Sequence, residues 1–147
     1  MTKRIALVLG TVVALVLVVA TGVAFAAVLT GNQNANTILG TSADDDITGA
    51  AGNDTLAGRA GNDTMYGDSG DDSVRGNMGT DYVDGGRGND IVNGGDGDND
   101  LVNVIDALPG DTAIGGRGTG DECAIDINGD TADPSCELVF VPQLRAP

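Results

Sequence analysis

The chain has 147 residues, enough for one domain, and carries 22 Asp and Glu against 7 Lys and Arg, for a formal net charge of −15. Such a charge repels nucleic acids and anionic membranes and attracts cations. The sequence has no His, no Trp and only two Cys, and it contains neither an HExxH nor a GxSxG motif, so no pattern in it indicates an enzyme.

Residues 1–26 have the pattern of a secretory signal peptide. A basic start, Lys3 and Arg4, precedes a long apolar run, and Ala24-Phe25-Ala26 is a small-x-small cleavage site. We expect cleavage before Ala27 and a secreted, extracellular product. The alternative is an uncleaved N-terminal membrane anchor, because the apolar run is long enough to span a bilayer.

Residues 27–39 contain the segment GNQNANTIL, a degenerate form of the repeat that follows. Gly31 and Ile38 occupy its first and eighth positions, and Asn36 occupies the sixth. Terminal repeats are usually atypical, and a terminal unit protects an open strand edge. We therefore expect an N-terminal cap here.

Residues 40–102 are seven consecutive nine-residue repeats: GTSADDDIT, GAAGNDTLA, GRAGNDTMY, GDSGDDSVR, GNMGTDYVD, GGRGNDIVN and GGDGDNDLV. Position one is always Gly, and position four is Gly in every unit except the first, which has Ala43. Position eight is always aliphatic or Met: Ile47, Leu56, Met65, Val74, Val83, Val92 and Leu101. Position six is almost always acidic: Asp45, Asp54, Asp63, Asp72, Asp81, Asp90 and Asn99.

Each repeat combines a turn with a very short strand. Its first six residues are rich in Gly, Asp and Asn, which favour turns, and its last three alternate polar, apolar, polar. Such a strand is stable only when stacked on copies of itself, which predicts an all-β solenoid with two strands and 18 residues per coil. Position eight then forms two apolar stacks, and position six forms a row of carboxylates along each of two edges. An acidic, Gly-rich disordered linker is the alternative, and a chain disordered without metal could fold with it.

Stacked carboxylates need a cation. Neighbours in a row would lie about 4.8 Å apart, the strand spacing, where like charges repel strongly. Calcium takes six to eight oxygen ligands in flexible geometry, whereas magnesium requires a strict octahedron and zinc prefers His and Cys. The pattern therefore favours calcium.

The repeats resemble the GGxGxDxUx nonapeptide of RTX (repeats-in-toxin, hemolysin-type) calcium-binding proteins. The resemblance implies a parallel β-roll, a right-handed solenoid with two sheets of short strands, that holds several calcium ions, up to about five. It also implies metal ligands at the position-six side chains and, in the best-matched loop GGRGND, at the carbonyls of Gly85, Gly86 and Gly88. The implied side-chain ligands are Asp45, Asp54, Asp63, Asp72, Asp81, Asp90 and Asn99. Position two departs from the family pattern, because it is Gly only at Gly86 and Gly95.

Residues 103–147 are predicted to form a C-terminal cap. The repeat partly returns at residues 115–124, with Asp121 in the carboxylate role and Cys123 in the inward role. An even number of cysteines in an exported chain predicts a disulfide between Cys123 and Cys136. Residues 137–141 are strand-like and could add a last strand over the end of the roll.

These patterns predict an exported, non-catalytic calcium-binding module whose folding is coupled to metal binding. The alternative is a cell-surface adhesion or interaction protein that uses the calcium-stabilised roll as a scaffold. Neither a nucleic acid nor a small-molecule substrate is expected as a partner.

Overall fold

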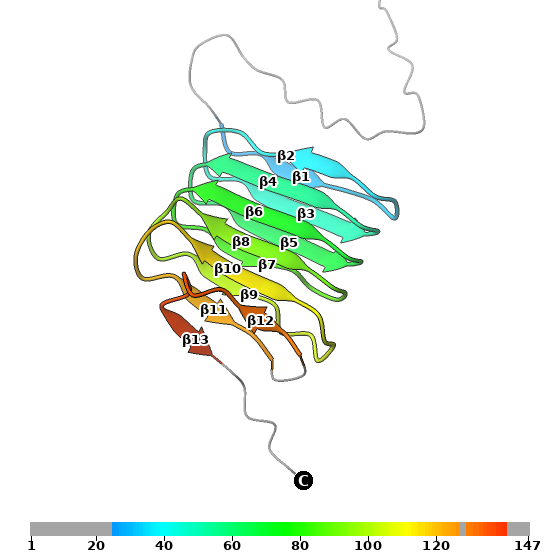
Figure 1. Ribbon diagram of the computed structural model, residues 1–147. Coiled ribbons are helices and arrows are strands. Elements are labelled where there is room, and N and C mark those ends of the chain that lie inside the picture. The colour runs from blue at the N-terminus through cyan, green and yellow to red at the C-terminus, as the bar shows by residue number, and fades with distance from the viewer. Residues whose placement is uncertain (1–24, 127–128, 141–147) are drawn as a thin grey trace, which may run out of the picture.

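The structure, a computed structural model, describes residues 25–126 and 129–140 and is a parallel β-solenoid (Figure 1). Successive strands alternate between two sheets, a seven-stranded one in the order β1-β3-β5-β7-β9-β11-β13 and a six-stranded one in the order β12-β10-β8-β6-β4-β2. This confirms the all-β solenoid with two strands per coil. Within these described ranges there is no helix, and hence none that is long and apolar enough to cross a membrane. Residues 1–24 of the predicted signal peptide lie outside the described residues.

The strands are short throughout. The seven-stranded sheet contains β1 (Val28–Thr30), β3 (Asp46–Ala51), β5 (Thr64–Ser69), β7 (Tyr82–Asp84), β9 (Leu101–Asn103), β11 (Glu122–Ala124) and β13 (Leu138–Phe140). The six-stranded sheet contains β2 (Thr37–Leu39), β4 (Thr55–Ala60), β6 (Ser73–Met78), β8 (Ile91–Gly95), β10 (Thr112–Gly116) and β12 (Thr131–Ala132).

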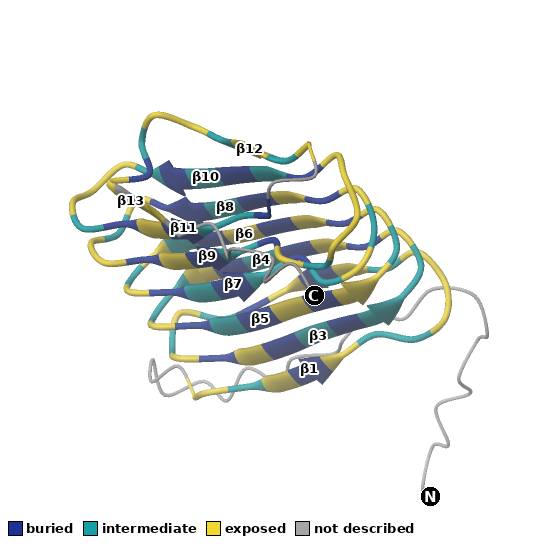
Figure 2. Ribbon diagram, turned by 90° about the horizontal axis from the view of Figure 1, so that it is seen from below, coloured by how far each residue is buried: buried dark blue, intermediate teal, exposed yellow. Residues whose placement is uncertain are grey.

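Position eight forms the core as two apolar stacks. Ile47 pairs with Met65, which pairs with Val83, and each of these side chains is fully buried. In the other sheet, Leu56 pairs with Val74, which pairs with Val92. Figure 2 shows buried and exposed residues alternating along the strands. Because strand side chains alternate between faces, one apolar residue per strand suffices to fill the narrow space between the sheets.

The last repeat has a different register from the predicted one. Val102, not Leu101, pairs with Val83 and is fully buried, whereas Leu101 is 39% exposed. The turn before β9 contains one residue more than the earlier turns, so the side chains of β9 are displaced by one place relative to the nine-residue period. A shift of one residue exchanges the two faces of a strand, so the prediction of Leu101 as a core residue was wrong.

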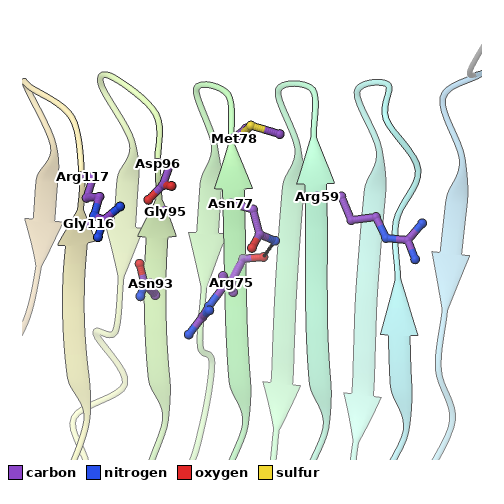
Figure 3. Close-up of a pocket in the computed structure, with 9 residues that line it drawn as sticks. All are labelled: Arg59, Arg75, Asn77, Met78, Asn93, Gly95, Asp96, Gly116 and Arg117. Carbon is purple, nitrogen blue, oxygen red and sulfur yellow. Dashed lines mark hydrogen bonds between the residues drawn. The ribbon is translucent and has the colours of Figure 1, made fainter.

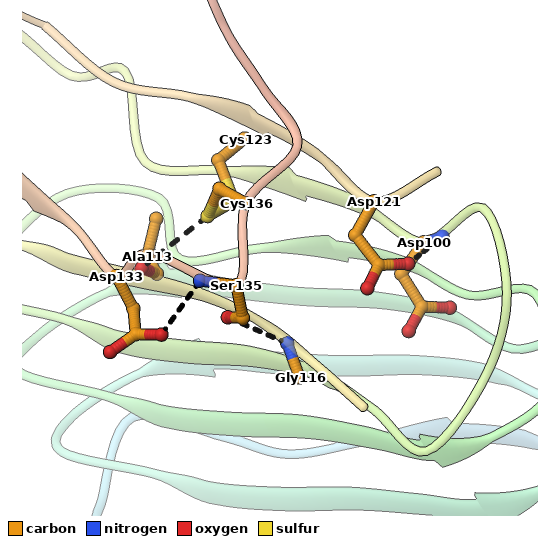
Figure 4. The surroundings of a disulfide bond; sticks show 8 residues. All are labelled: Asp100, Ala113, Gly116, Asp121, Cys123, Asp133, Ser135 and Cys136. Atoms are coloured by element: carbon orange, nitrogen blue, oxygen red, sulfur yellow. Dashed lines mark hydrogen bonds between the residues drawn. A yellow bond between two sulfur atoms is a disulfide. The ribbon is translucent and has the colours of Figure 1, made fainter. Parts of the chain in front are cut away.

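The solenoid continues beyond residue 102. β10 to β13 extend both sheets, with Ala113 paired to Val92 and Cys123 paired to Val102. Cys123 is bonded to Cys136 across a Cα–Cα distance of 5.7 Å, which confirms the predicted disulfide (Figure 4). The strand-like segment near the C-terminus forms β13, which pairs with β11 at the end of the seven-stranded sheet.

The degenerate first unit forms part of the first coil. Ile38 pairs with Leu56, and Leu29 pairs with Ile47, so both continue the apolar stacks. β1 and β2 are the end strands of their sheets, as a terminal unit requires.

Candidate metal centre

The position-six carboxylates lie inside the molecule. Each closes a glycine-rich turn and immediately precedes a strand, so its side chain lies on the same side of the backbone as the core residue two positions later. Their exposed fractions are 4% or less for Asp45, Asp54, Asp63, Asp72, Asp81 and Asp90. Burial of unpaired carboxylates is costly, so these side chains need partners.

One oxygen of each carboxylate is held by the backbone of the preceding coil. The amide of Asp45 donates to Oδ1 of Asp63 at 2.8 Å, and the amide of Asp63 donates to Oδ1 of Asp81 at 2.8 Å. Along the opposite edge, Asp54 donates in the same way to Asp72, and Asp72 donates to Asp90. The predicted rows of stacked carboxylates are therefore present on both edges, and each bond fixes the direction of the second oxygen.

In every row member except Asp45, that second oxygen has no hydrogen-bond partner. Buried Oδ2 atoms without a donor occur in Asp54, Asp63, Asp72, Asp81, Asp90, Asp100, Asp111 and Asp121. A row of oriented, desolvated carboxylate oxygens without donors is the arrangement that a bound cation would complete.

Carbonyl oxygens of glycines in the next coil lie close to several of these Oδ2 atoms. A Cβ atom added to Gly49 would lie 2.5 Å from Oδ2 of Asp54 and 2.8 Å from the carbonyl oxygen of Gly67, one coil further along. A Cβ added to Gly94 would lie 2.6 Å from both Oδ2 of Asp100 and the carbonyl oxygen of Gly115. Position one is therefore glycine because two oxygens occupy the space that a side chain would need.

The carboxylates hold their protons unusually tightly. Burial raises the pKa of Asp81 and Asp111 to about 7, and that of Asp72, Asp90 and Asp100 to about 6. Neighbouring carboxylates raise these values further, and the backbone N–H of the previous coil lowers them only in part. The metal-free site thus disfavours its own charged form.

Two of the carboxylates were not assigned from the sequence. Asp100 is 1% exposed and accepts a hydrogen bond from the amide of Asp81 at 2.8 Å, so it takes the place predicted for Asn99. Asn99 is exposed, with φ of 61°, and its amide bonds to the carbonyl of Thr119 instead. The register shift at the last repeat explains this correction.

Asp111 continues the other row outside the nine-residue repeats. It is 1% exposed and accepts the amide of Asp90 at 2.7 Å, across 21 residues instead of 18. Asp121, predicted in the carboxylate role, accepts the amide of Asp100 at 3.1 Å. The available signal for Asp111 was an acid two residues before a small apolar residue, Ala113, behind a Pro-Gly turn.

The first carboxylate differs from the others. Oδ2 of Asp45 accepts the amide of Thr41 at 2.5 Å, and its Oδ1 accepts the Thr41 hydroxyl at 3.0 Å. With both oxygens already engaged, Asp45 has less capacity for a cation than the carboxylates further along its row.

Comparison with known proteins identifies the repeats. Residues 30–65, 39–74 and 75–102 match the family model of the RTX calcium-binding nonapeptide repeat (4 copies). The chain belongs to the RTX calcium-binding repeat family. No curated protein and no solved structure matched it.

RTX repeats bind calcium, and the donor set of this chain fits that ion. The available donors are carboxylate and carbonyl oxygens, which a hard cation prefers, and both cysteines are used in the disulfide. Over residues 25–126 and 129–140, no three His, Cys, Asp or Glu side chains gather closely enough to hold a metal by themselves. A calcium ion here would therefore take one or two carboxylates and complete its shell with backbone carbonyls.

The three glycines predicted to donate carbonyls lie in one turn. The carbonyl oxygen of Gly85 approaches the same point beside Gly67 as Oδ2 of Asp72, which suits a shared ligand role. Gly86 and Gly88 have φ of 92° and 145°, and each packs against the backbone of the preceding coil. Their role as calcium ligands stays a prediction.

Proposed function

We propose that this RTX chain is a non-catalytic module that binds calcium between successive coils along both edges and folds as it does so. The observation that carries the proposal is the row of buried Oδ2 atoms without donors, which lie beside a glycine carbonyl at Asp54, Asp63, Asp72, Asp81 and Asp100. Asp111 and Asp121 extend the proposed binding edges past the matched repeats.

Electrostatic repulsion supports the coupling between binding and folding. Two carboxylates about 4.8 Å apart repel by roughly 3 kcal/mol at an effective dielectric constant of about 20. Several such pairs along two edges reach the ~5–15 kcal/mol that stabilises a whole domain. A divalent ion between each pair replaces this repulsion with attraction, so the folded state gains stability as calcium binds.

Circular dichroism of the chain at pH 7.5 tests this function directly. A coil spectrum in chelator should change to a β spectrum on titration with calcium, in the ~10⁻⁴–10⁻³ M range usual for extracellular modules. Magnesium at the same concentration should not produce the change. A β spectrum that persists in chelator would show that the roll holds without metal, and a coil at every calcium concentration would refute the coupling.

We also propose that the chain acts outside the cytoplasm. The signal-peptide pattern of residues 1–26 and the Cys123–Cys136 disulfide support this location, because disulfides persist in oxidising compartments. Mass spectrometry of the exported protein should find Ala27 as the N-terminus. An intact N-terminus in the membrane fraction would favour the anchored alternative.

A further inference from the structure

The outer face of the six-stranded sheet carries a groove that calcium binding does not use. Its volume is about 580 Å³, and three arginines line it, Arg59 on β4, Arg75 on β6 and Arg117 just after β10 (Figure 3). All three side chains are exposed, and Asp96 is the only acidic residue of the lining. On a chain with a net charge of −15, this face is a local concentration of positive charge.

Strand register creates the hollow. Asn77 of β6 pairs with Gly95 of β8, which pairs with Gly116 of β10. At these paired positions, the neighbouring strands β8 and β10 both have glycine and therefore no side chain. Figure 3 shows Arg75, Asn77 and Arg117 around this region. From β4 to β10 the groove crosses three strand intervals, roughly 14 Å, which suits a short extended ligand better than a single ion.

We propose that this groove binds an acidic polysaccharide that carries sulfate or carboxylate groups. Guanidinium groups bind such anions through paired hydrogen bonds, and the arginines remain charged at every physiological pH. The amide groups of Asn77 and Asn93 also line the groove and supply polar partners for sugar hydroxyls.

The lining disfavours the other anionic ligands. None of the nine residues is aromatic, so a nucleobase would have no ring to stack on. Met78 is the only large apolar residue among them, which leaves little surface for lipid chains or for an apolar peptide. Sulfate or carboxylate together with hydroxyl groups is the combination that the groove matches.

Binding of dextran sulfate oligosaccharides to the full chain in calcium tests the proposal, with uncharged dextran as the matched ligand. The wild type should bind dextran sulfate and not dextran. The double variant Arg75→Gln/Arg117→Gln should bind dextran sulfate at least tenfold more weakly, because charge-assisted hydrogen bonds are lost. Both side chains are exposed, so the calcium-dependent circular dichroism spectrum should be unchanged.

Arg75→Gln alone should also weaken binding, and its matched control is Arg87→Gln, which likewise removes one exposed positive charge but lies outside the groove. Arg87→Gln should change the affinity less than twofold. An equal loss with Arg87→Gln would overturn the proposal by showing a response to net charge alone, and so would equal binding of dextran. Tighter, arginine-dependent binding of DNA or of phosphatidylserine vesicles would assign the groove to another partner. Calcium titration of the same samples tests the proposed function separately.

Discussion

Position two of the repeat has a left-handed backbone in six units. The φ angle there is 83° at Ala50, 90° at Arg59 and 83° at Asn77, close to the 92° of Gly86. A residue with a Cβ pays about 1–2 kcal/mol for this conformation, and glycine does not. The units that depart from the family pattern at this position therefore fold less stably than the pattern allows.

Ala50→Gly should stabilise the calcium-bound chain by up to about 1 kcal/mol, because relief of the left-handed strain exceeds the extra backbone entropy of glycine. Ala51→Gly, one residue further in the same strand, should destabilise by about 0.5–1 kcal/mol, because no strain is relieved there. Urea unfolding in calcium measures both changes. If both variants change the free energy of unfolding in the same direction, the left-handed backbone at Ala50 is not a source of strain.

Asp63 occupies the middle of a carboxylate row, between Asp45 and Asp81. Asp63→Asn keeps an oxygen for the amide of Asp45 but removes the charge that two adjacent calcium positions would share. We expect the calcium stoichiometry, measured by isothermal titration calorimetry, to fall by about two ions. The control is Asp46→Asn, which removes an exposed carboxylate next to Asp45 and should leave the calcium stoichiometry unchanged. If Asp63→Asn also leaves the calcium stoichiometry unchanged, Asp63 is not a ligand shared by two ions.

At the scale of the strand, a single inward side chain determines whether a coil can stack. Val74 is 1% exposed and lies between Leu56 and Val92 in the six-stranded sheet. A charge at this place would be buried without a partner, at a cost of several kcal/mol. Because neighbouring coils share the same stack, the defect affects the whole solenoid.

Val74→Asp should therefore abolish the β spectrum even in excess calcium. Ser73→Asp, at the exposed preceding position, adds the same charge and should fold normally. Circular dichroism in calcium distinguishes the two variants. A folded Val74→Asp chain would mean that position eight does not form the core.

At the scale of the whole molecule, pH and calcium act on the same carboxylates. The pKa values of about 6 and 7 in the metal-free fold lie above the value of 3.8 in an unfolded chain. Between about pH 4 and 7 the folded state therefore binds more protons than the unfolded state, and its stability rises as the pH falls. With calcium bound, the sign reverses, because protons compete with the metal for the same oxygens.

In chelator, the β content at pH 5 should exceed that at pH 7.5. In calcium, lowering the pH from 7.5 to 5 should weaken calcium affinity. Circular dichroism and calorimetry at the two pH values measure both effects. If β content in chelator does not rise at the lower pH, the carboxylates are not the groups that destabilise the metal-free fold.

Most features of the solenoid follow from the repeat pattern of the amino-acid sequence. The nine-residue period maps one unit to one turn and one strand, so the 18-residue coil, the two apolar stacks and the two rows of carboxylates follow from spacing alone. The disulfide followed from the cysteine count. These features depend on local pattern, which repetition makes unambiguous.

Where the nine-residue period fails, the packing of one coil on the next selects which residues point inward. At the last repeat, Asn99 and Asp100 are both suitable oxygen donors, and Leu101 and Val102 are both suitable core residues. Stacking on Asp81 and Val83 selects Asp100 and Val102. Likewise, Arg59, Arg75 and Arg117 share no common period, and they line one groove because parallel pairing brings distant residues side by side on one face.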